Sequence, residues 1–355
     1  MADRISALRQ LAADNDADAI LVTHPPDLRW ALGFSGSNGL LAVRDDDALF
    51  VTDGRYTEQA RQQVARVPTA IAASGLAEHV AGSGFLTGVQ RAVVSSDHLT
   101  VSAFETMTSA LGGTEVIPVR QLVAVAIATK TLAEIEGVRQ AQLVTADVFD
   151  AVLPFLRAGV SERDIAAEIV YQHLKKGAEA MSFEPIVAAG ARGALPHARP
   201  SEHVLAEGDL VVIDMGGIVD GFCSDMTRTV AIGDPGDDAR EAYAVVLEAQ
   251  MAAVHAARAG MTGSALDRVA RDVIEQAGFG DAFSHSLGHG VGYEVHEWPR
   301  LSQHVEHVLP VGATVTIEPG VYLPGLFGIR IEDIVALREG GADNLTTPTK
   351  ELLIL

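Results

Sequence analysis

The residues best suited to carry chemistry lie in a stretch rich in histidine and glycine, residues 283–298, which reads FSHSLGHGVGYEVHEW. Its three histidines are His285, His289 and His296. Imidazoles bind metal ions and transfer protons near neutral pH. The glycines among them carry no Cβ, so the backbone allows a ligand to approach closely. The spacing of these residues predicts a functional site.

Four acidic residues accompany the histidines, each within or beside an apolar, strand-like run. Carboxylates are seldom buried without a partner, because desolvating an unpaired ion costs several kcal/mol or more. Four carboxylates and one imidazole form a mostly hard ligand set, which suits two divalent ions that share bridging carboxylates better than one zinc ion. The residues are Asp214, Asp225, Glu318, Glu332 and the imidazole of His289.

Mn²⁺, Co²⁺, Zn²⁺ and Fe²⁺ are all compatible with such a ligand set. Two ions roughly 4 Å apart activate water at neutral pH and polarise a carbonyl or phosphoryl oxygen, so the sequence predicts a hydrolase. Asp214 and Asp225 are joined by a glycine-rich connection, residues 216–221, that is typical of a hairpin. Glu318 ends one predicted strand and Glu332 lies in the next. We therefore expect two hairpins that contribute two carboxylates each.

Composition narrows the class of protein. The chain of 355 residues is long enough for two domains, and its single cysteine, Cys223, excludes an internal disulfide framework. The formal net charge is −21, without a basic stripe, which argues against nucleic acid as a principal partner. No apolar run approaches the roughly 18 residues of a membrane span, and no targeting segment is visible. We therefore expect a cytoplasmic protein that does not bind membranes.

Helical and strand-like patterns alternate along the chain, which predicts an α/β fold. A smaller N-terminal α/β domain, residues 1–125, is followed by an apolar link and an α+β domain, residues 126–355. The second domain opens on a long helix, residues 135–152. In the first domain we expect helices at 4–13, 57–66 and 101–111, strands at 19–22, 92–94 and 115–119, and a hairpin of 40–43 with 48–51.

The second domain contains an internal echo. The segments Arg157–Ser161 and Arg258–Thr262 both place a glycine before a hydroxyl residue suited to cap a helix. The candidate site residues recur at similar offsets of about 100 residues, His197 with His296, Asp214 with Glu318, and Asp225 with Glu332. This pattern predicts two related halves that face each other across a pseudo-two-fold axis, with one site between them.

Taken together, these motifs resemble the proline-specific metallopeptidases of the pita-bread fold, Xaa-Pro dipeptidase (prolidase) and aminopeptidase P. The resemblance covers essentially the whole chain, because residues 33–39 and 53–56 are similar to the creatinase-like N-terminal domain of that family. In the second domain it rests on the contexts His197-Ala-Arg-Pro, Asp214, Asp225, His285-Ser-Leu-Gly-His-Gly-Val-Gly, His296-Glu-Trp-Pro, Glu318-Pro-Gly and Arg330-Ile-Glu-Asp.

The resemblance implies a role for each site residue. Asp214 would bind one metal, His289 and Glu318 would bind the other, and Asp225 and Glu332 would bridge both. His197 and His296 would contact the substrate and the tetrahedral intermediate. As a mechanistic hypothesis, we add that Glu318 carries a proton to the leaving nitrogen. The predicted substrate-binding residues are His285 beside the proline pocket, Arg330 beside the bridging carboxylates, and Arg300.

Several alternatives remain open at this point. A dipeptidase needs a cation for the free carboxylate of its product, a role that Arg300 suits, whereas an aminopeptidase needs an open channel for longer proline-containing peptides. Methionine aminopeptidase is disfavoured by the N-terminal domain, and creatinase-like hydrolysis by the complete ligand set. A catalytically inactive peptide-binding module is the alternative of a different class. The resemblance also implies a homodimer, with the loop Phe34 to Gly39 near the partner's site.

Overall fold

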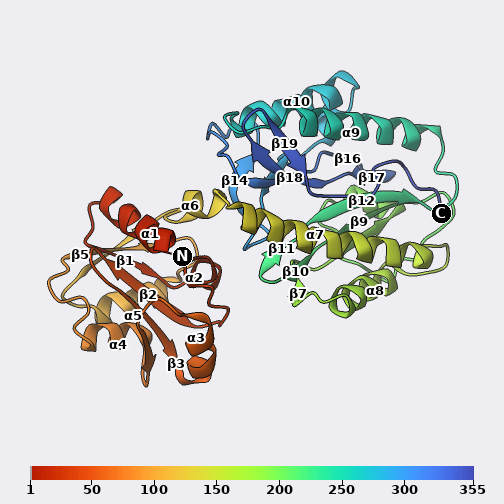
Figure 1. The fold of residues 1–355 in the computed structure, drawn as a ribbon. Helices are drawn as coiled ribbons and strands as arrows, with labels where there is room; N and C mark the ends of the chain where they lie inside the picture. Colours follow the sequence, from red (N-terminus) through yellow and green to blue (C-terminus); the bar gives the residue numbers. More distant parts are fainter. Residues whose placement is uncertain (1) are drawn as a thin grey trace. The chain divides into compact units, whose positions relative to one another are not determined.

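The computed structural model describes residues 2–355, which form two compact units, the first ending at Ile127 and the second spanning Ala128–Leu355 (Figure 1). The sequence analysis placed the division at residues 125 and 126. Helix α6 (Ala124–Ala128) runs across the division. None of the helices formed by residues 2–355 has the length and apolar character that crossing a membrane requires.

The first unit is built on one six-stranded mixed sheet with the strand order β4-β3-β2-β1-β5-β6. Strands β1, β2 and β3 pair antiparallel, while β4, β5 and β6 join them in parallel. The strands are β1 (Ala19–Val22), β2 (Gly39–Arg44), β3 (Ala48–Asp53), β4 (Thr69–Ala72), β5 (Arg91–Ser95) and β6 (Glu115–Val119). The helices are α1 (Ala2–Asp14), α2 (Pro25–Leu32), α3 (Thr57–Gln63), α4 (Leu76–Gly82) and α5 (Val101–Ala110).

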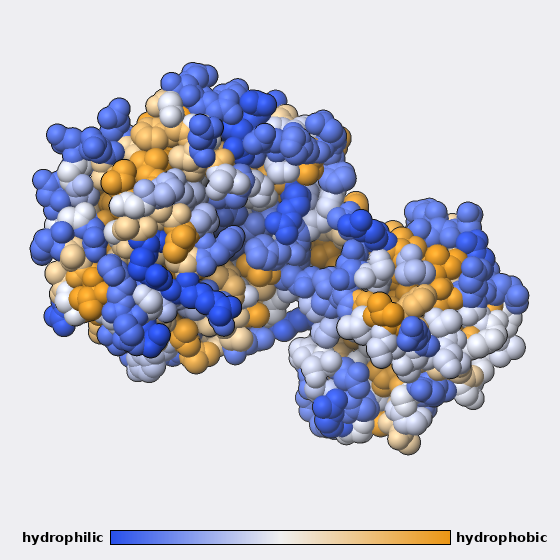
Figure 2. Space-filling model, turned by 180° about the vertical axis from the view of Figure 1, so that it is seen from behind, coloured by the Kyte–Doolittle hydropathy of each residue, from blue (hydrophilic) through white to orange (hydrophobic). Residues whose placement is uncertain are grey.

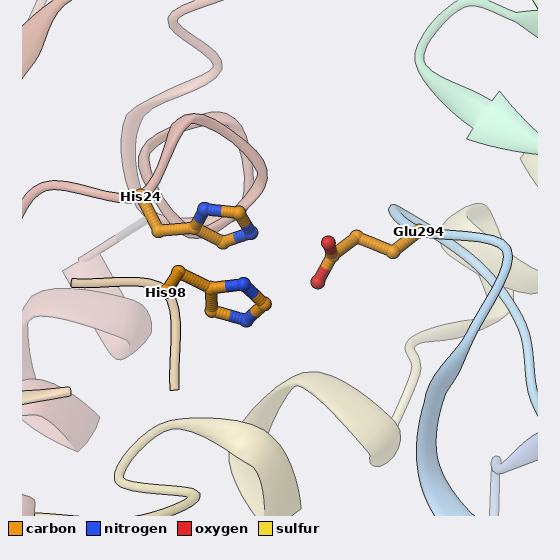
Figure 3. A group of neighbouring side chains, drawn as sticks. All are labelled: His24, His98 and Glu294. Carbon is orange, nitrogen blue, oxygen red and sulfur yellow. The ribbon is translucent and has the colours of Figure 1, made fainter. Parts of the chain in front are cut away.

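The hairpin, the flanking strands and the three helices predicted for this unit are confirmed. The sequence analysis missed α2, which begins at Pro25, where a strand was taken to end. Proline is well tolerated in the first turn of a helix, because its missing N–H would have no partner there. Just before α2, His24 stacks on His98, with ring centroids 3.6 Å apart and the planes 4° from parallel (Figure 3). This contact packs the loop after β1 against the loop before α5.

The second unit places two helix pairs on opposite sides of its strands (Figure 1). The pairs are α7 (Leu132–Val152) with α8 (Glu162–Lys175), and α9 (Asp237–Ala256) with α10 (Gly263–Gln276). The first strands are β7 (Ala180–Met181), β8 (Ile186–Ala189), β9 (Leu210–Met215), β10 (Gly217–Val219), β11 (Phe222–Cys223) and β12 (Met226–Ala231). The later strands are β13 (Gly288–Gly290), β14 (Glu297–Leu301), β15 (Thr314–Ile317), β16 (Gly320–Leu323), β17 (Phe327–Arg330), β18 (Asp333–Arg338) and β19 (Gly341–Asn344).

The order of two helices followed by antiparallel strands occurs twice in this unit, so the predicted repeat is confirmed. Ser161 caps α8 and forms an antiparallel bridge with Val204, and Thr262 caps α10 and forms the equivalent bridge with Val308. Each half contributes most of the residues of one hydrophobic cluster between helices and strands. We refer below to the first half (Ala128 to Gly233) and the second half (Asp234 to Leu355) of this unit.

The exterior agrees with the acidic composition. Hydrophilic side chains cover much of the face shown in Figure 2, and hydrophobic ones form patches between them. Exposed apolar residues such as Val101 and Leu132 are common on globular proteins.

Candidate metal centre

The four carboxylates are positioned by two pairs of antiparallel strands. In the first half β9 pairs with β12, and Asp214 lies opposite Thr227. In the second half β15 pairs with β18. Only Asp214 lies within a strand. The expectation that Glu332 also does so is wrong, because Glu332 precedes β18, just as Asp225 precedes β12.

The connections between the paired strands also differ from the predicted simple hairpins. The chain makes an additional strand pair in each connection, β10 with β11 in the first half and β16 with β17 in the second. After each additional strand pair, the chain returns to the end of the strand that it left, so the two carboxylates of each half still lie close together. The structure thus brings the carboxylates of each half together as expected, while the predicted path between them was wrong.

The predicted ligands converge on one point. Asp225, His289 and Glu332 each offer a ligand atom within 4.8 Å of the other two. Nε2 of His289 lies 3.2 Å from Oε1 of Glu318 and 3.7 Å from Oδ2 of Asp225. Asp214 joins the same group across the paired strands.

These ligands lie in the wall of a cavity of about 450 Å³ in the second unit. The structure brings every predicted site residue to this cavity and leaves none elsewhere. The lining includes the five predicted ligands and the five other candidate residues, His197, His285, His296, Arg300 and Arg330.

His289 is oriented as a metal ligand would be. Its Nδ1 lies 3.0 Å from the carbonyl oxygen of Gly290, and this partner assigns the ring proton to Nδ1. Nε2 therefore points toward the carboxylates of Glu318 and Asp225, and a metal ion or a proton fits between them. Three electron-rich groups in contact repel one another unless a proton or a cation lies among them.

The carboxylates show the same shortage of positive charge. Burial, together with repulsion from neighbouring carboxylates, raises the pKa of Asp225 and of Glu332 well above the usual range. Burial also raises the pKa of Asp214, whose Oδ1 is buried and has no hydrogen-bond partner among residues 2–355. Burial acts in the same direction on Glu318, but the hydrogen bond and charge of His289 outweigh it and hold the pKa at about 2. This donor set fits divalent cations.

Arg330 is the cation that pairs directly with this group. Its Nη2 donates to Oδ2 of Asp214 at 2.7 Å. The resemblance placed Arg330 beside the bridging carboxylates, whereas it reaches Glu332 only through Thr227, whose hydroxyl accepts from Arg330 Nε and donates to Glu332 Oε2 at 2.7 Å. Arg330 therefore orients ligands from both halves.

His285 is held from both ring nitrogens. Its Nδ1 lies 2.8 Å from the carbonyl oxygen of Ser286, and its Nε2 lies 2.9 Å from the hydroxyl of Tyr322, which also accepts from Arg330 Nη1. Burial lowers the pKa of His285. The ring therefore meets the cavity as a neutral, fixed wall.

The other two histidines and Arg300 are exposed to the cavity. The ring of His296 meets that of His289 edge to face, with centroids 4.5 Å apart. Burial, with the nearby charges of His289 and Arg300, lowers the pKa of His296 to about 4, so it is neutral at pH 7. His197 lies on the loop after β8 in the first half.

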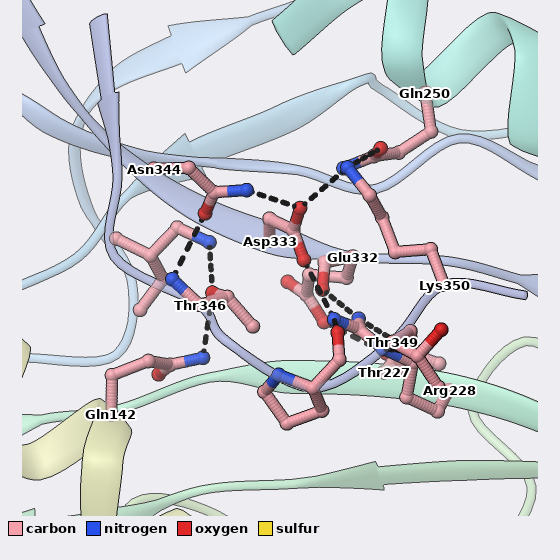
Figure 4. Close-up of polar contacts among 12 residues, drawn as sticks. Gln142, Thr227, Arg228, Gln250, Glu332, Asp333, Asn344, Thr346, Thr349 and Lys350 are labelled. Carbon is pink, nitrogen blue, oxygen red and sulfur yellow. Dashed lines mark hydrogen bonds and ion pairs between the residues drawn. The ribbon is translucent and has the colours of Figure 1, made fainter. Parts of the chain in front are cut away.

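Sequence reasoning missed several residues that hold the ligands. Thr227 lies two positions after Asp225, so strand alternation was a signal that could have identified it. Below the ligands, Arg228 donates to the carbonyl of Glu332 and to Oδ1 of Asp333, and Lys350 donates to Oδ2 of Asp333 (Figure 4). No sequence pattern pointed to this buried network.

A carboxylate-rich centre with one imidazole is typical of a metal-dependent hydrolase. In this protein the centre lies between two related halves of one domain. The model of metallopeptidase family M24 matches residues 136–339, and that of the creatinase/prolidase N-terminal domain matches residues 4–126. The chain therefore belongs to metallopeptidase family M24.

Full-length relatives support this assignment. An Xaa-Pro dipeptidase of Pyrococcus furiosus is 36% identical over 99% of this chain and 100% of that protein. The solved structure of an Xaa-Pro dipeptidase from Bacillus anthracis is 38% identical and covers 99% of each chain with a TM-score of 0.96. That of an X-Pro aminopeptidase from Thermotoga maritima is 36% identical and covers 96% of this chain and 98% of that one, with a TM-score of 0.89.

Proposed function

We propose that this protein hydrolyses the peptide bond between an N-terminal residue and proline, and that it acts best on Xaa-Pro dipeptides. The observation that supports dipeptides is the position of Arg300 in the cavity wall. No ion pair or hydrogen bond to another described residue, within 2–355, engages its guanidinium. By contrast, Arg199 in the same wall faces Glu184 at 4.0 Å. A free guanidinium suits the carboxylate of a C-terminal proline.

The proposal includes two divalent metal ions, Mn²⁺, Co²⁺, Zn²⁺ or Fe²⁺. Asp214 would hold one, His289 and Glu318 the other, and Asp225 and Glu332 both. When bound, such ions lower the pKa of water and polarise the substrate carbonyl.

The remaining steps belong to side chains of the protein. An Xaa-Pro amide has no N–H, so recognition relies on the ring and the carboxylate of proline. The fixed, neutral wall of His285 suits the ring. His296, neutral at pH 7, donates a hydrogen bond to the developing oxyanion, with His197 as the second candidate. Glu318, a carboxylate at this pH, accepts a proton from the attacking water and passes it to the departing nitrogen.

A comparison of three substrates tests the proposal, with Mn²⁺, Co²⁺ or Zn²⁺ supplied. We expect Xaa-Pro to be cleaved faster than the same peptide extended beyond proline, and an Xaa-Ala control to be cleaved poorly. Faster cleavage of the longer peptide would instead identify an aminopeptidase. Absence of cleavage with every metal would favour the peptide-binding module.

Arg300→Gln tests the proposed carboxylate contact. Loss of a charge-assisted hydrogen bond, about 1.5–3 kcal/mol, should raise KM for Xaa-Pro by about 10-fold or more. Xaa-Pro amide, which lacks the charged carboxylate, should be little affected. Arg199→Gln is the matched control, and an equal effect of both variants on Xaa-Pro would contradict the role of Arg300. A homodimer and a cytoplasmic location are further parts of the proposal, which sedimentation and cell fractionation would test.

A further inference from the structure

A buried ion pair lies beside the site but outside the ligand set. Nζ of Lys130 donates to Oε2 of Glu297 at 2.7 Å, and their side chains are 0% and 6% exposed. Lys130 directly precedes Thr131, the capping residue of α7, and Glu297 directly follows His296. The desolvation of two charges is expensive, and removing one partner leaves the other uncompensated.

Glu297 also holds the backbone of the loop that leads to His296. Its Oε1 accepts from the backbone N–H of Tyr293 at 2.6 Å and of Glu294 at 3.1 Å. Residues 291–296 belong to no helix or strand. Buried backbone N–H groups outside regular structure need such an acceptor.

Lys130 determines the path of the same loop from the other side. A Cβ added to Gly292 would lie 2.2 Å from Cε and 2.8 Å from Nζ of Lys130. The backbone at Gly292 therefore passes close to the end of the Lys130 side chain, and a larger residue there would have to displace this side chain from its place beside Glu297. The chain between His289 and His296 thus passes beside the buried ammonium group of Lys130.

We propose that Lys130 and Glu297 are positioning residues for His296. The pair fixes the loop 291–297 and thereby sets the imidazole of His296 against that of His289, 4.5 Å away between ring centroids. The inference rests on the proposed function, because it requires His296 to act on the substrate. Neither member of the pair lines the cavity.

The first test is Lys130→Met in the metal-loaded protein. A misplacement of about 1 Å can cost about 100-fold in rate, so we expect kcat on Xaa-Pro to fall between 10- and 100-fold while KM changes less than about threefold. The double variant K130M/E297Q removes both charges and keeps an amide oxygen for the two N–H groups. It should retain more activity than either single variant.

The decisive test places Lys130→Met in a His296→Ala background. A residue that acts through His296 has little left to affect there, so the further loss in kcat should be less than about twofold. A full additional loss would mean that the pair supports the fold in general, and the inference would be wrong. If Lys130→Met fails to fold, Glu297→Gln enters the same cycle.

Two readouts besides activity separate positioning from metal binding. Amide hydrogen exchange should increase in residues 291–297 of Lys130→Met, while β15 and β18 stay protected. Mn²⁺ affinity, measured by titration calorimetry, should stay within threefold of the unmodified protein. A large loss of affinity would show that the pair acts on His289 instead and would overturn the inference.

Ile165→Ala is the control for stability alone, because it removes a fully buried side chain by which α8 packs into the core of the first half. It should lower the melting temperature without changing kcat at 25 °C. The two proposals fail separately. Full kcat in His296→Ala would remove the proposed role of His296, whereas a reduced kcat in His296→Ala with normal kcat in Lys130→Met would overturn only the positioning role.

Discussion

The two halves of the second unit have the same architecture but contribute unequal chemistry. Counting along the paired strands, Ala188 of β8 occupies the position that His289 has in β13. The first half therefore supplies only carboxylates to the proposed ligand set, while the second also supplies an imidazole. A duplicated fold can thus place equivalent carboxylates symmetrically, and the two proposed metal positions would still differ chemically.

The halves also hold each other's ligands. Arg330 of the second half pairs with Asp214 of the first, and Thr227 of the first half donates to Glu332 of the second. Because these buried contacts join the two halves, the positions of Asp214 and Glu332 depend on how the halves pack against each other. The comparison therefore predicts that substitutions at equivalent positions of the two halves lower activity equally only where the two residues have the same role.

The largest effects should come from Asp225 and Glu332, the two carboxylates proposed to bridge the metal ions, which occupy equivalent positions in the two halves. Asp225→Asn and Glu332→Gln should each lower kcat by more than the ~10³-fold that loss of a single oxyanion donor costs. Steady-state kinetics at saturating Mn²⁺ would measure this. If one variant retained near-normal kcat, the two halves would not share the metals equally.

The histidines at equivalent positions should differ. His296→Ala should lower kcat by roughly 10²- to 10³-fold, because it removes the proposed oxyanion donor. His197→Ala should change KM more than kcat. The ring of His296 contacts the ring of His289, and among residues 2–355 no such ring contact is found for His197. The comparison of kcat and KM for both variants would decide, and a larger kcat loss in His197→Ala would exchange the two roles.

Contacts between the halves should have an intermediate effect. Thr227→Val removes the hydroxyl that links Arg330 to Glu332 and should weaken metal binding about 10- to 100-fold, as measured by titration calorimetry. Thr229→Val is the matched control, because among residues 2–355 the hydroxyl of Thr229 bonds only to the backbone of Arg330. Equal losses in both variants would mean that the link to Glu332 is unimportant.

The smallest effect should be the change in stability on metal removal, which depends on pH. The pKa values of Asp225 and Glu332 are raised in the folded protein by burial and by repulsion from neighbouring carboxylates, so the metal-free fold binds more protons than the unfolded chain. Its stability therefore falls as the pH rises above the ordinary carboxyl range. The melting temperature should be lower without metal, and the difference should widen from pH 5 to pH 8. Calorimetry showing a constant difference would contradict this.

Much of the fold could be predicted from local patterns. The long helix α7 follows from apolar residues at helical spacing, and the hairpin of β2 and β3 from two apolar runs around an acidic turn. The helix α2 was missed because its two prolines suggested a break. The excursions β10–β11 and β16–β17 were missed because short strands are defined by their partners rather than by their own sequence.

For the site, the sequence by itself determined which groups are available. Asp214, Asp225, His289, Glu318 and Glu332 stand out because carboxylates and histidine in apolar or glycine-rich surroundings are costly without a ligand. Only the tertiary structure decided how they are held. Arg330 pairs with Asp214, Thr227 with Glu332, and Lys130 with Glu297, across 105 or more residues of chain in each case. Such pairs leave no local pattern, because electrostatic and hydrogen-bond energies depend on distance in space and not on separation along the sequence.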